Sequence, residues 1–143
     1  MTYKVSKKHL VEQGLIKPSP VDRKIVSALL ERAEIDLETA ERNLDPDPEC
    51  AYTYSYTAML RCGQALMFTR GFQPDVKDKH RTIVRFAGIA LGPKHDDLVN
   101  DFDLMRRKRN RLIYEPSAPC SRSEATHALS TAKRFLRETR KVV

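Results

Sequence analysis

The sequence predicts an all-α protein, an up-down four-helix bundle with an additional short helix and an N-terminal helical turn. Through four long segments, apolar residues recur at alternating spacings of four and three, which places them on one buried stripe of a helix. The prolines fall between these segments, and no run alternates apolar and polar residues as a half-buried strand would. With 143 residues, 41% of them hydrophobic, and no internal repeat, the chain is expected to form a single domain over residues 1–143.

The first two predicted helices precede residue 45. Residues 6–13 can form a short helix that Gly14 closes. The prolines that follow break the chain and supply Ser19 as N-cap and Pro20 as the first residue of a long helix. This helix should end at the proline-rich turn of residues 45–48. Its predicted buried stripe consists of Val26, Leu30, Ala33, Leu37, Ala40 and Leu44.

The next long helix is predicted over Cys50–Arg70 and ends at Gly71. Gly63 lies on its buried side, where the missing side chain would allow another helix to approach closely. A shorter helix should follow over Lys79–Leu91 and end at Gly92. The buried stripe of the long helix is Tyr52, Tyr56, Met59, Gly63 and Leu66.

The last two long helices are predicted over Asp96–Glu115 and from Ser121 almost to the C-terminus, with prolines between them. Ser121 and Glu124 have the spacing of a capping box. Two connections between the long helices are short and the third contains the small helix, which favours antiparallel neighbours. The predicted stripes are Leu98, Phe102, Met105, Arg109 and Leu112 in one helix, and Ala125, Leu129, Ala132 and Leu136 in the other.

Arg109 is the only charged residue on any of these stripes. A guanidinium stays protonated, and burying it unpaired costs several kcal/mol, so it must meet a carboxylate, line a wet groove or face a partner molecule. A buried ion pair is the structural explanation that competes with a functional one. The basic residues around it could likewise complement the dipole of a helix whose first turn contains Asp96 and Asp97.

The composition narrows the class of protein. Lys and Arg outnumber Asp and Glu by 26 to 19, giving a net charge of +7, which suits a polyanionic partner. The three cysteines form no Cys-x-x-Cys pair, and the four histidines lack metal-ligand spacing, so reduced thiols, no metal and no cofactor are expected. No run has the length of a membrane span or the pattern of a signal peptide, so we expect a soluble, cytoplasmic protein.

The chain resembles the HEPN domain family over most of residues 8–138. The signature of that family is Arg, often followed by Asn, with His four to six residues after the Arg. Here Arg109-Asn110 is followed by Tyr114, so Tyr occupies the position of the signature His. The segments that share the resemblance are Ala33 through Ala40, Tyr56-Thr57-Ala58, Ala65-Leu66, Gly71-Phe72-x-Pro74 and His80.

The resemblance implies a helical domain that forms a homodimer, with signature residues of both subunits lining a basic cleft that takes RNA. Active members are metal-independent endoribonucleases, many of them toxins of toxin–antitoxin pairs or effectors of phage defence, and others are inactive binding modules. On this reading the catalytic residues would be Arg109, Asn110 and Tyr114. The RNA-binding residues would be Arg106, Arg107, Lys108, Arg111 and His80.

The Tyr in the signature position leaves two functions open. Metal-independent RNA cleavage needs proton transfer as well as positive charge on the transition state. A histidine transfers protons readily near neutral pH, whereas a tyrosine hydroxyl, with an ordinary pKa near 10, is ionised in only about one molecule in a thousand. Tyr114 could instead donate a hydrogen bond or stack on a base. The alternative is a catalytically silent module that dimerises or docks a cognate antitoxin or nucleotidyltransferase.

Overall fold

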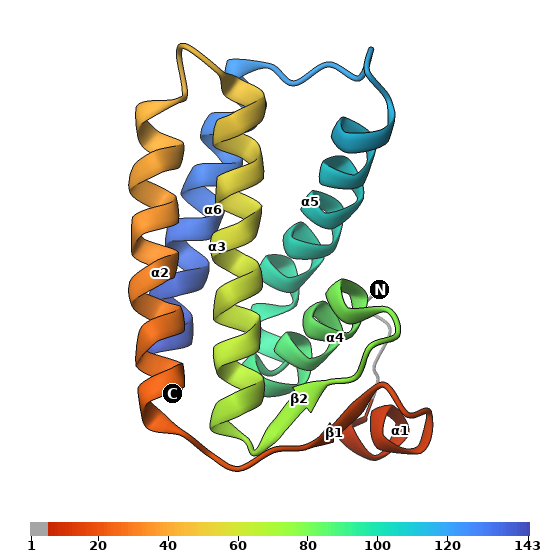
Figure 1. Cartoon of the computed structure of the whole chain (residues 1–143). Coiled ribbons are helices and arrows are strands. Elements are labelled where there is room, and N and C mark those ends of the chain that lie inside the picture. Colours follow the sequence, from red (N-terminus) through yellow and green to blue (C-terminus); the bar gives the residue numbers. More distant parts are fainter. Residues whose placement is uncertain (1–5) are drawn as a thin grey trace.

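The computed structural model describes residues 6–143, which form a helical bundle (Figure 1). The chain runs up one long helix and down the next, twice, so the predicted all-α, up-down bundle is confirmed. A short helix α4 lies beside the lower half of α5. The elements are α1 (Lys7–Glu12), β1 (Ile16–Pro18), α2 (Arg23–Arg42), α3 (Pro48–Thr69), β2 (Phe72–Pro74), α4 (Lys79–Leu91), the 3-10 turn η1 (Pro93–His95), α5 (Asp96–Tyr114) and α6 (Arg122–Arg140).

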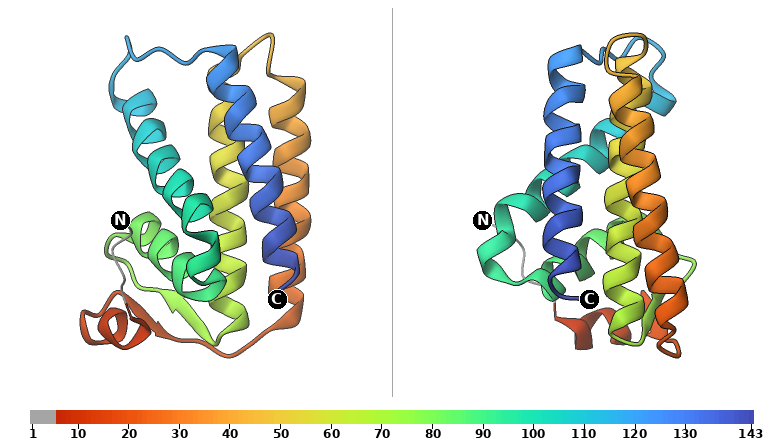
Figure 2. Two further views of the ribbon diagram at one scale, coloured as in Figure 1. Left: turned by 180° about the vertical axis from the view of Figure 1, so that it is seen from behind. Right: turned by 90° about the vertical axis from the view of Figure 1, so that its left-hand side faces the viewer.

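Helix α3 is the centre of the bundle and packs against α2, α4, α5 and α6 (Figures 1 and 2). All five residues of its predicted stripe are buried. A row of aromatic rings links three helices through the core: the ring centroids of Tyr56 and Phe102 are 5.8 Å apart, and those of Phe102 and Phe135 are 5.0 Å apart. These contacts fix the position of α5 against α3 and α6.

The predicted stripes of α2, α5 and α6 are also buried, with two exceptions. Leu44 lies just beyond the end of α2 and is only partly buried against the core. Arg109 is half-buried, whereas the other members of its stripe on α5 are buried. The guanidinium of Arg109 therefore lies at the margin of the core, where it avoids the cost of full desolvation.

Gly63 permits a close approach between α3 and α4. A Cβ atom at this position would lie 2.3 Å from Cγ2 of Ile83, a distance that no side chain can tolerate. The predicted role of this glycine is therefore confirmed. The contact holds the middle of α4 against α3 and so places the first turn of α4 beside α5.

The segment before α2 differs from the prediction. Residues 16–18 pair antiparallel with residues 72–74, and the N–H of Ser19 donates to the carbonyl oxygen of Gly71 over 2.8 Å. Ser19 is thus held in this extended pairing, and the prediction that Ser19 and Pro20 begin the helix is wrong. Helix α2 begins at Arg23, and the carboxylate of Asp22 caps it by accepting from the N–H of Lys24 over 2.9 Å.

Other predicted helix ends are confirmed. Ser6 caps α1, and Gly14 follows it with φ +67°, a conformation that glycine adopts without strain. Ser121 and Glu124 form the predicted capping box at the start of α6. Among the described residues, none of the helices has the length and apolar character needed to span a membrane.

Candidate nucleic-acid interface

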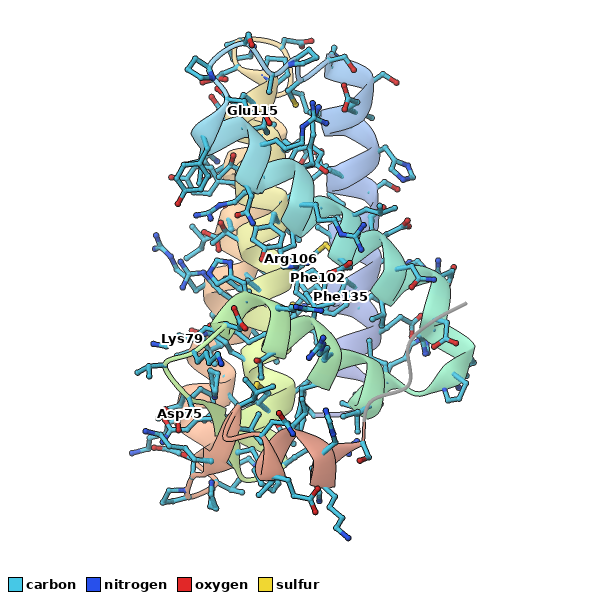
Figure 3. All side chains as sticks on the ribbon, turned by 90° about the vertical axis from the view of Figure 1, so that its right-hand side faces the viewer. Asp75, Lys79, Phe102, Arg106, Glu115 and Phe135 are labelled. Atoms are coloured by element: carbon cyan, nitrogen blue, oxygen red, sulfur yellow. The ribbon has the colours of Figure 1, made fainter. Side chains whose placement is uncertain are left out.

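A pocket of about 290 Å³ lies between the first turn of α4 and the middle of α5. Figure 3 views this face of the molecule, with Lys79 at the start of α4 and Arg106 on α5. Because four of its lining residues are Lys or Arg and only one is an acid, the pocket attracts anions. The lining residues are Asp78, Lys79, His80 and Arg81 from the α4 side, and Arg106, Arg109 and Asn110 from α5.

Arg109 lines this pocket without an ion-pair partner. Among residues 6–143, no carboxylate lies within 4.0 Å of its guanidinium. Of the three environments that the sequence left open, the structure shows no ion pair to Arg109 within residues 6–143 and places its side chain at an open pocket. A half-buried guanidinium with free donors is well suited to a bidentate contact with phosphate.

Arg106 is oriented by Asp103, one turn earlier on α5. Its Nε lies 3.0 Å from Oδ1 of Asp103, while Nη2 of Arg107 lies 2.6 Å from Oδ2. Burial raises the pKa of Asp103, but hydrogen bonds and charges from the two arginines outweigh it and leave the pKa below its ordinary value. Asp103 therefore stays ionised and holds Arg106 at the pocket, while Arg107 points to solvent.

His80 is fixed by a buried tyrosine. The hydroxyl of Tyr56, whose side chain is 1% exposed, lies 3.0 Å from Nδ1 of His80. Burial lowers the pKa of His80, and the positive charges of Arg109 and Arg106 lower it further. Burial raises the pKa of Tyr56 above its ordinary value. At neutral pH the pair therefore consists of an uncharged imidazole and an intact hydroxyl.

The structure brings together only part of the predicted site. Asn110 joins Arg106, Arg109 and His80 at the pocket, but Tyr114 is 79% exposed in the last turn of α5 and does not line it. Helical geometry places Tyr114 about 140° around the axis from Arg109. A single chain therefore does not bring Tyr114 to the pocket, and its catalytic role stays a prediction.

The remaining basic residues of α5 lie outside the pocket. Nζ of Lys108 lies 3.1 Å from the carboxylate of Glu124, on the side facing α6, and its side chain is 14% exposed. Nε of Arg111 pairs with Glu115 over 3.2 Å on the outer surface. The roles of Lys108 and Arg111 in binding RNA stay predictions, and RNA would have to extend beyond the pocket along α5 to reach them.

The basic residues of α6 are largely neutralised. Lys133 pairs with Glu41, Arg134 with Asp97, and Arg140 with Glu34, at distances of 3.3, 3.0 and 2.7 Å. These pairs connect α6 to α2 and α5 on exposed surfaces. We interpret these basic residues as a solvent-exposed surface stabilised by ion pairs, whereas Arg109 has no such partner in residues 6–143.

Sequence reasoning missed several pocket residues. Lys79 and Arg81 flank His80 in the sequence, and this basic triplet at a predicted helix start was a usable signal. Asp78 precedes it with a φ of 50°, a left-handed conformation that is uncommon outside glycine. Tyr56 was predicted as a core residue on an apolar stripe and lies in a segment that shares the family resemblance, but neither observation indicated its contact with His80.

The residues present do not form a metal centre. Within residues 6–143, there is no cluster of three or more His, Cys, Asp or Glu side chains that could hold a metal ion. The arrangement can instead bind an anion through guanidinium and ammonium groups, with an amide and an imidazole alongside.

Comparison with known proteins assigns the fold to a family. The family model of the HEPN domain matches residues 26–142, which span α2 to α6 and include every residue lining the pocket. Searches among curated proteins and among solved structures gave no match. The resemblance seen in the sequence is thereby confirmed over most of the chain.

Proposed function

Because the chain belongs to the HEPN domain family, we propose that it is an RNA-directed protein whose α4–α5 pocket binds the phosphate backbone of RNA. Membership of the family indicates a nucleotide-binding or ribonuclease-type function. The observation that carries the proposal is Arg109, a half-buried guanidinium that no carboxylate of the described chain neutralises, inside a pocket rich in cations. A phosphate group would supply the missing counter-charge.

Each pocket residue can contact a different part of the RNA. Arg109 offers a bidentate contact to one phosphate, and Arg106, held by Asp103, adds a second guanidinium. The amide of Asn110 can hydrogen-bond a ribose hydroxyl or a base edge. Tyr114, exposed at the end of the same helix, is available to stack on an unpaired base.

A homodimer would enlarge this interface. Besides Tyr114, Leu104 on the same outer side of α5 is 58% exposed, which is a high exposure for a large apolar side chain. Burying them against the α5 of a second copy would place two Arg109 pockets along one basic surface. In this arrangement Tyr114 of one subunit can approach the pocket of the other, which a single chain does not allow.

The cleaving form of the proposed function is a metal-independent endoribonuclease, acting as a toxin or in phage defence. Arg109 would stabilise the negative charge that develops on the phosphorus oxygens. A cognate antitoxin or nucleotidyltransferase is the partner that this setting implies. RNA binding, which is the central part of the proposal, requires neither the cleavage activity nor the partner protein.

A second candidate function is a catalytically inactive interaction module. The observation that favours it is the exposed apolar pair on the outer side of α5, Leu104 and Tyr114, next to basic side chains. On this account the Arg106→Glu/Arg107→Glu double variant changes the oligomeric state and leaves RNA behaviour unaltered. Sedimentation of the wild type as a strict monomer would contradict it.

Binding of a short single-stranded RNA at low salt tests the main proposal. We expect Arg109→Ala to weaken binding about tenfold and to reduce the slope of log affinity against log salt by about 0.7, the value for one lost phosphate contact. The matched control is Arg134→Ala, which removes an arginine of α6 that pairs with Asp97 away from the pocket. Equal affinities for wild type and Arg109→Ala would refute the proposal.

A further inference from the structure

We propose that His80 is the proton-transfer residue of this pocket and that Tyr56 is the positioning residue that orients its ring. The inference rests on the proposed function, because it adds a cleavage step to the RNA-binding pocket. It assigns to α4 the imidazole that α5 lacks, since the signature position on α5 carries Tyr114. The substrate class is single-stranded RNA with a free 2′-hydroxyl beside the bound phosphate.

The geometry leaves one nitrogen of His80 available to a substrate. Nδ1 is occupied by the Tyr56 hydroxyl at 3.0 Å, on the buried side of the ring. Nε2 is then the nitrogen that a ligand in the pocket can reach. Tyr56 cannot shift easily, because its ring lies 5.8 Å from that of Phe102 in the core. His80 is therefore pre-oriented, as efficient proton transfer requires.

The charges around His80 favour the form that accepts a proton. On α5 the ring faces Arg106 and Arg109, and on its own helix the pocket includes Asp78, Lys79 and Arg81. The cations exceed the single acid, and burial acts in the same direction by lowering the pKa of His80. The imidazole is thus uncharged at neutral pH and can act as a base.

Tyr56 can serve both protonation states of the ring. In the tautomer that accepts at Nε2, Nδ1–H donates to the oxygen of Tyr56. When Nε2 takes up a proton, the same bond becomes charge-assisted and stabilises the imidazolium. Because burial raises the pKa of Tyr56, its hydroxyl stays neutral throughout and does not compete as a base.

The step is a transesterification that needs no metal. Nε2 of His80 takes the proton of the 2′-hydroxyl, and the 2′ oxygen attacks the phosphorus held by Arg109. The bond from phosphorus to the 5′ oxygen breaks with its electron pair, and water protonates the leaving oxygen. The products are a 2′,3′-cyclic phosphate and a 5′-hydroxyl, and His80 returns its proton to solvent.

RNA cleavage in excess chelator, measured beside RNA binding, tests the role of His80. We expect His80→Ala to lower cleavage by about a hundredfold or more, to weaken binding far less than it lowers cleavage, and to regain part of the rate when imidazole is added. His127→Ala, an exposed histidine on α6, is the matched control and should cleave like the wild type. Undiminished cleavage by His80→Ala would overturn the inference.

The same experiment separates this inference from the proposed function. A wild type that binds RNA but does not cleave it contradicts the role of His80 and leaves the binding function standing. A wild type that does neither removes the proposed function as well. Cleavage that survives in His80→Ala but disappears in Tyr114→Phe would move the proton transfer to Tyr114 and likewise overturn the inference.

The dependence of the cleavage rate on pH tests the role of Tyr56. Removing its hydroxyl leaves the imidazolium of His80 without an acceptor, which lowers the pKa of the ring. Tyr56→Phe should therefore cleave more slowly, and the acid limb of its profile, the range in which the rate falls as His80 becomes protonated, should shift to lower pH. The matched control is Tyr52→Phe, a buried tyrosine on the same stripe of α3, for which the limb should stay in place. A slower Tyr56→Phe enzyme with an unmoved limb would assign Tyr56 a purely structural role.

Discussion

Arg109 and His80 line the same pocket, and after burial the charge of Arg109 is the strongest influence lowering the pKa of His80. The guanidinium of Arg109 and the imidazole of His80 thus face the same pocket, and no carboxylate of residues 6–143 pairs with Arg109. Such an arrangement costs folding free energy, and a bound anion would supply the opposite charge. Its energetic consequences can be measured without any RNA.

The first prediction concerns pH and stability. Because the folded-state pKa of His80 is below its unfolded value of about 6.5, the unfolded chain binds more protons in the interval between the two. Stability should therefore be at its full value above pH 6.5 and fall as the pH decreases through that interval. Urea unfolding at pH 7.5 and 5.5 should show a larger loss for wild type than for His80→Gln. Equal losses would exclude the shift, and His127→Gln is the control.

The second prediction separates binding from stability at Arg109. Arg109→Met keeps the length of the side chain but removes a half-buried charge that has no ion-pair partner in residues 6–143, so stability should be unchanged or rise by up to about 1 kcal/mol. The control is Arg107→Met, which breaks an exposed ion pair with Asp103 and should cost about 0.5 kcal/mol. Chemical unfolding at low salt measures both. A large destabilisation by Arg109→Met would show that Arg109 is structural.

The third prediction concerns the contact between α3 and α4. Gly63→Ala would place Cβ 2.3 Å from Cγ2 of Ile83 and should destabilise the protein by about 1–3 kcal/mol. Gly88→Ala, where the nearest atom is 3.4 Å away, should instead stabilise by up to about 1 kcal/mol through helix propensity.

A second substitution checks the cause of this effect. Ile83→Leu removes the Cγ2 methyl group, so adding it to Gly63→Ala should recover part of the lost stability. Thermal unfolding of the single and double variants gives the coupling free energy. Additive effects would indicate that another contact is responsible.

The fourth prediction concerns Asp36, a carboxylate that is 1% exposed and lies 2.6 Å from Nε of Arg61. Arg61→Met leaves the buried charge with only Arg32, at 3.9 Å, and should cost about 3 kcal/mol. Asp36→Asn should cost less, about 1–2 kcal/mol, because the side chain of Arg61 is 30% exposed and can be hydrated. Urea unfolding that ranks the two variants in the opposite order would contradict this account.

Much of the fold was predictable because each long helix repeats its apolar residues with helical spacing. Gly63 could be assigned to a close helix contact on the same basis. The pairing of β1 with β2 was not predictable, since three-residue strands carry no periodic signal and both strands contain a proline. That pairing also explains why Ser19 does not cap α2.

The candidate site was predictable in part. Arg109 stood out as a charge on an apolar stripe, and its place at a pocket follows from that position. The sequence did not show that Lys108, which was also predicted to bind RNA, turns towards Glu124 of α6, because that contact depends on the packing of two helices. The contact between Tyr56 and His80 joins residues on different helices and likewise depends on tertiary structure.

The most direct test of the account is to observe the side chains of the pocket while RNA binds. An NMR titration with a short single-stranded RNA can follow the Nε–H signals of arginines and the ring nitrogens of histidines. We predict saturable shifts of Arg109 and His80 that track the measured affinity. Saturable shifts confined to the basic side chains of α6, with Arg109 and His80 unmoved, would contradict the claim that this pocket receives RNA.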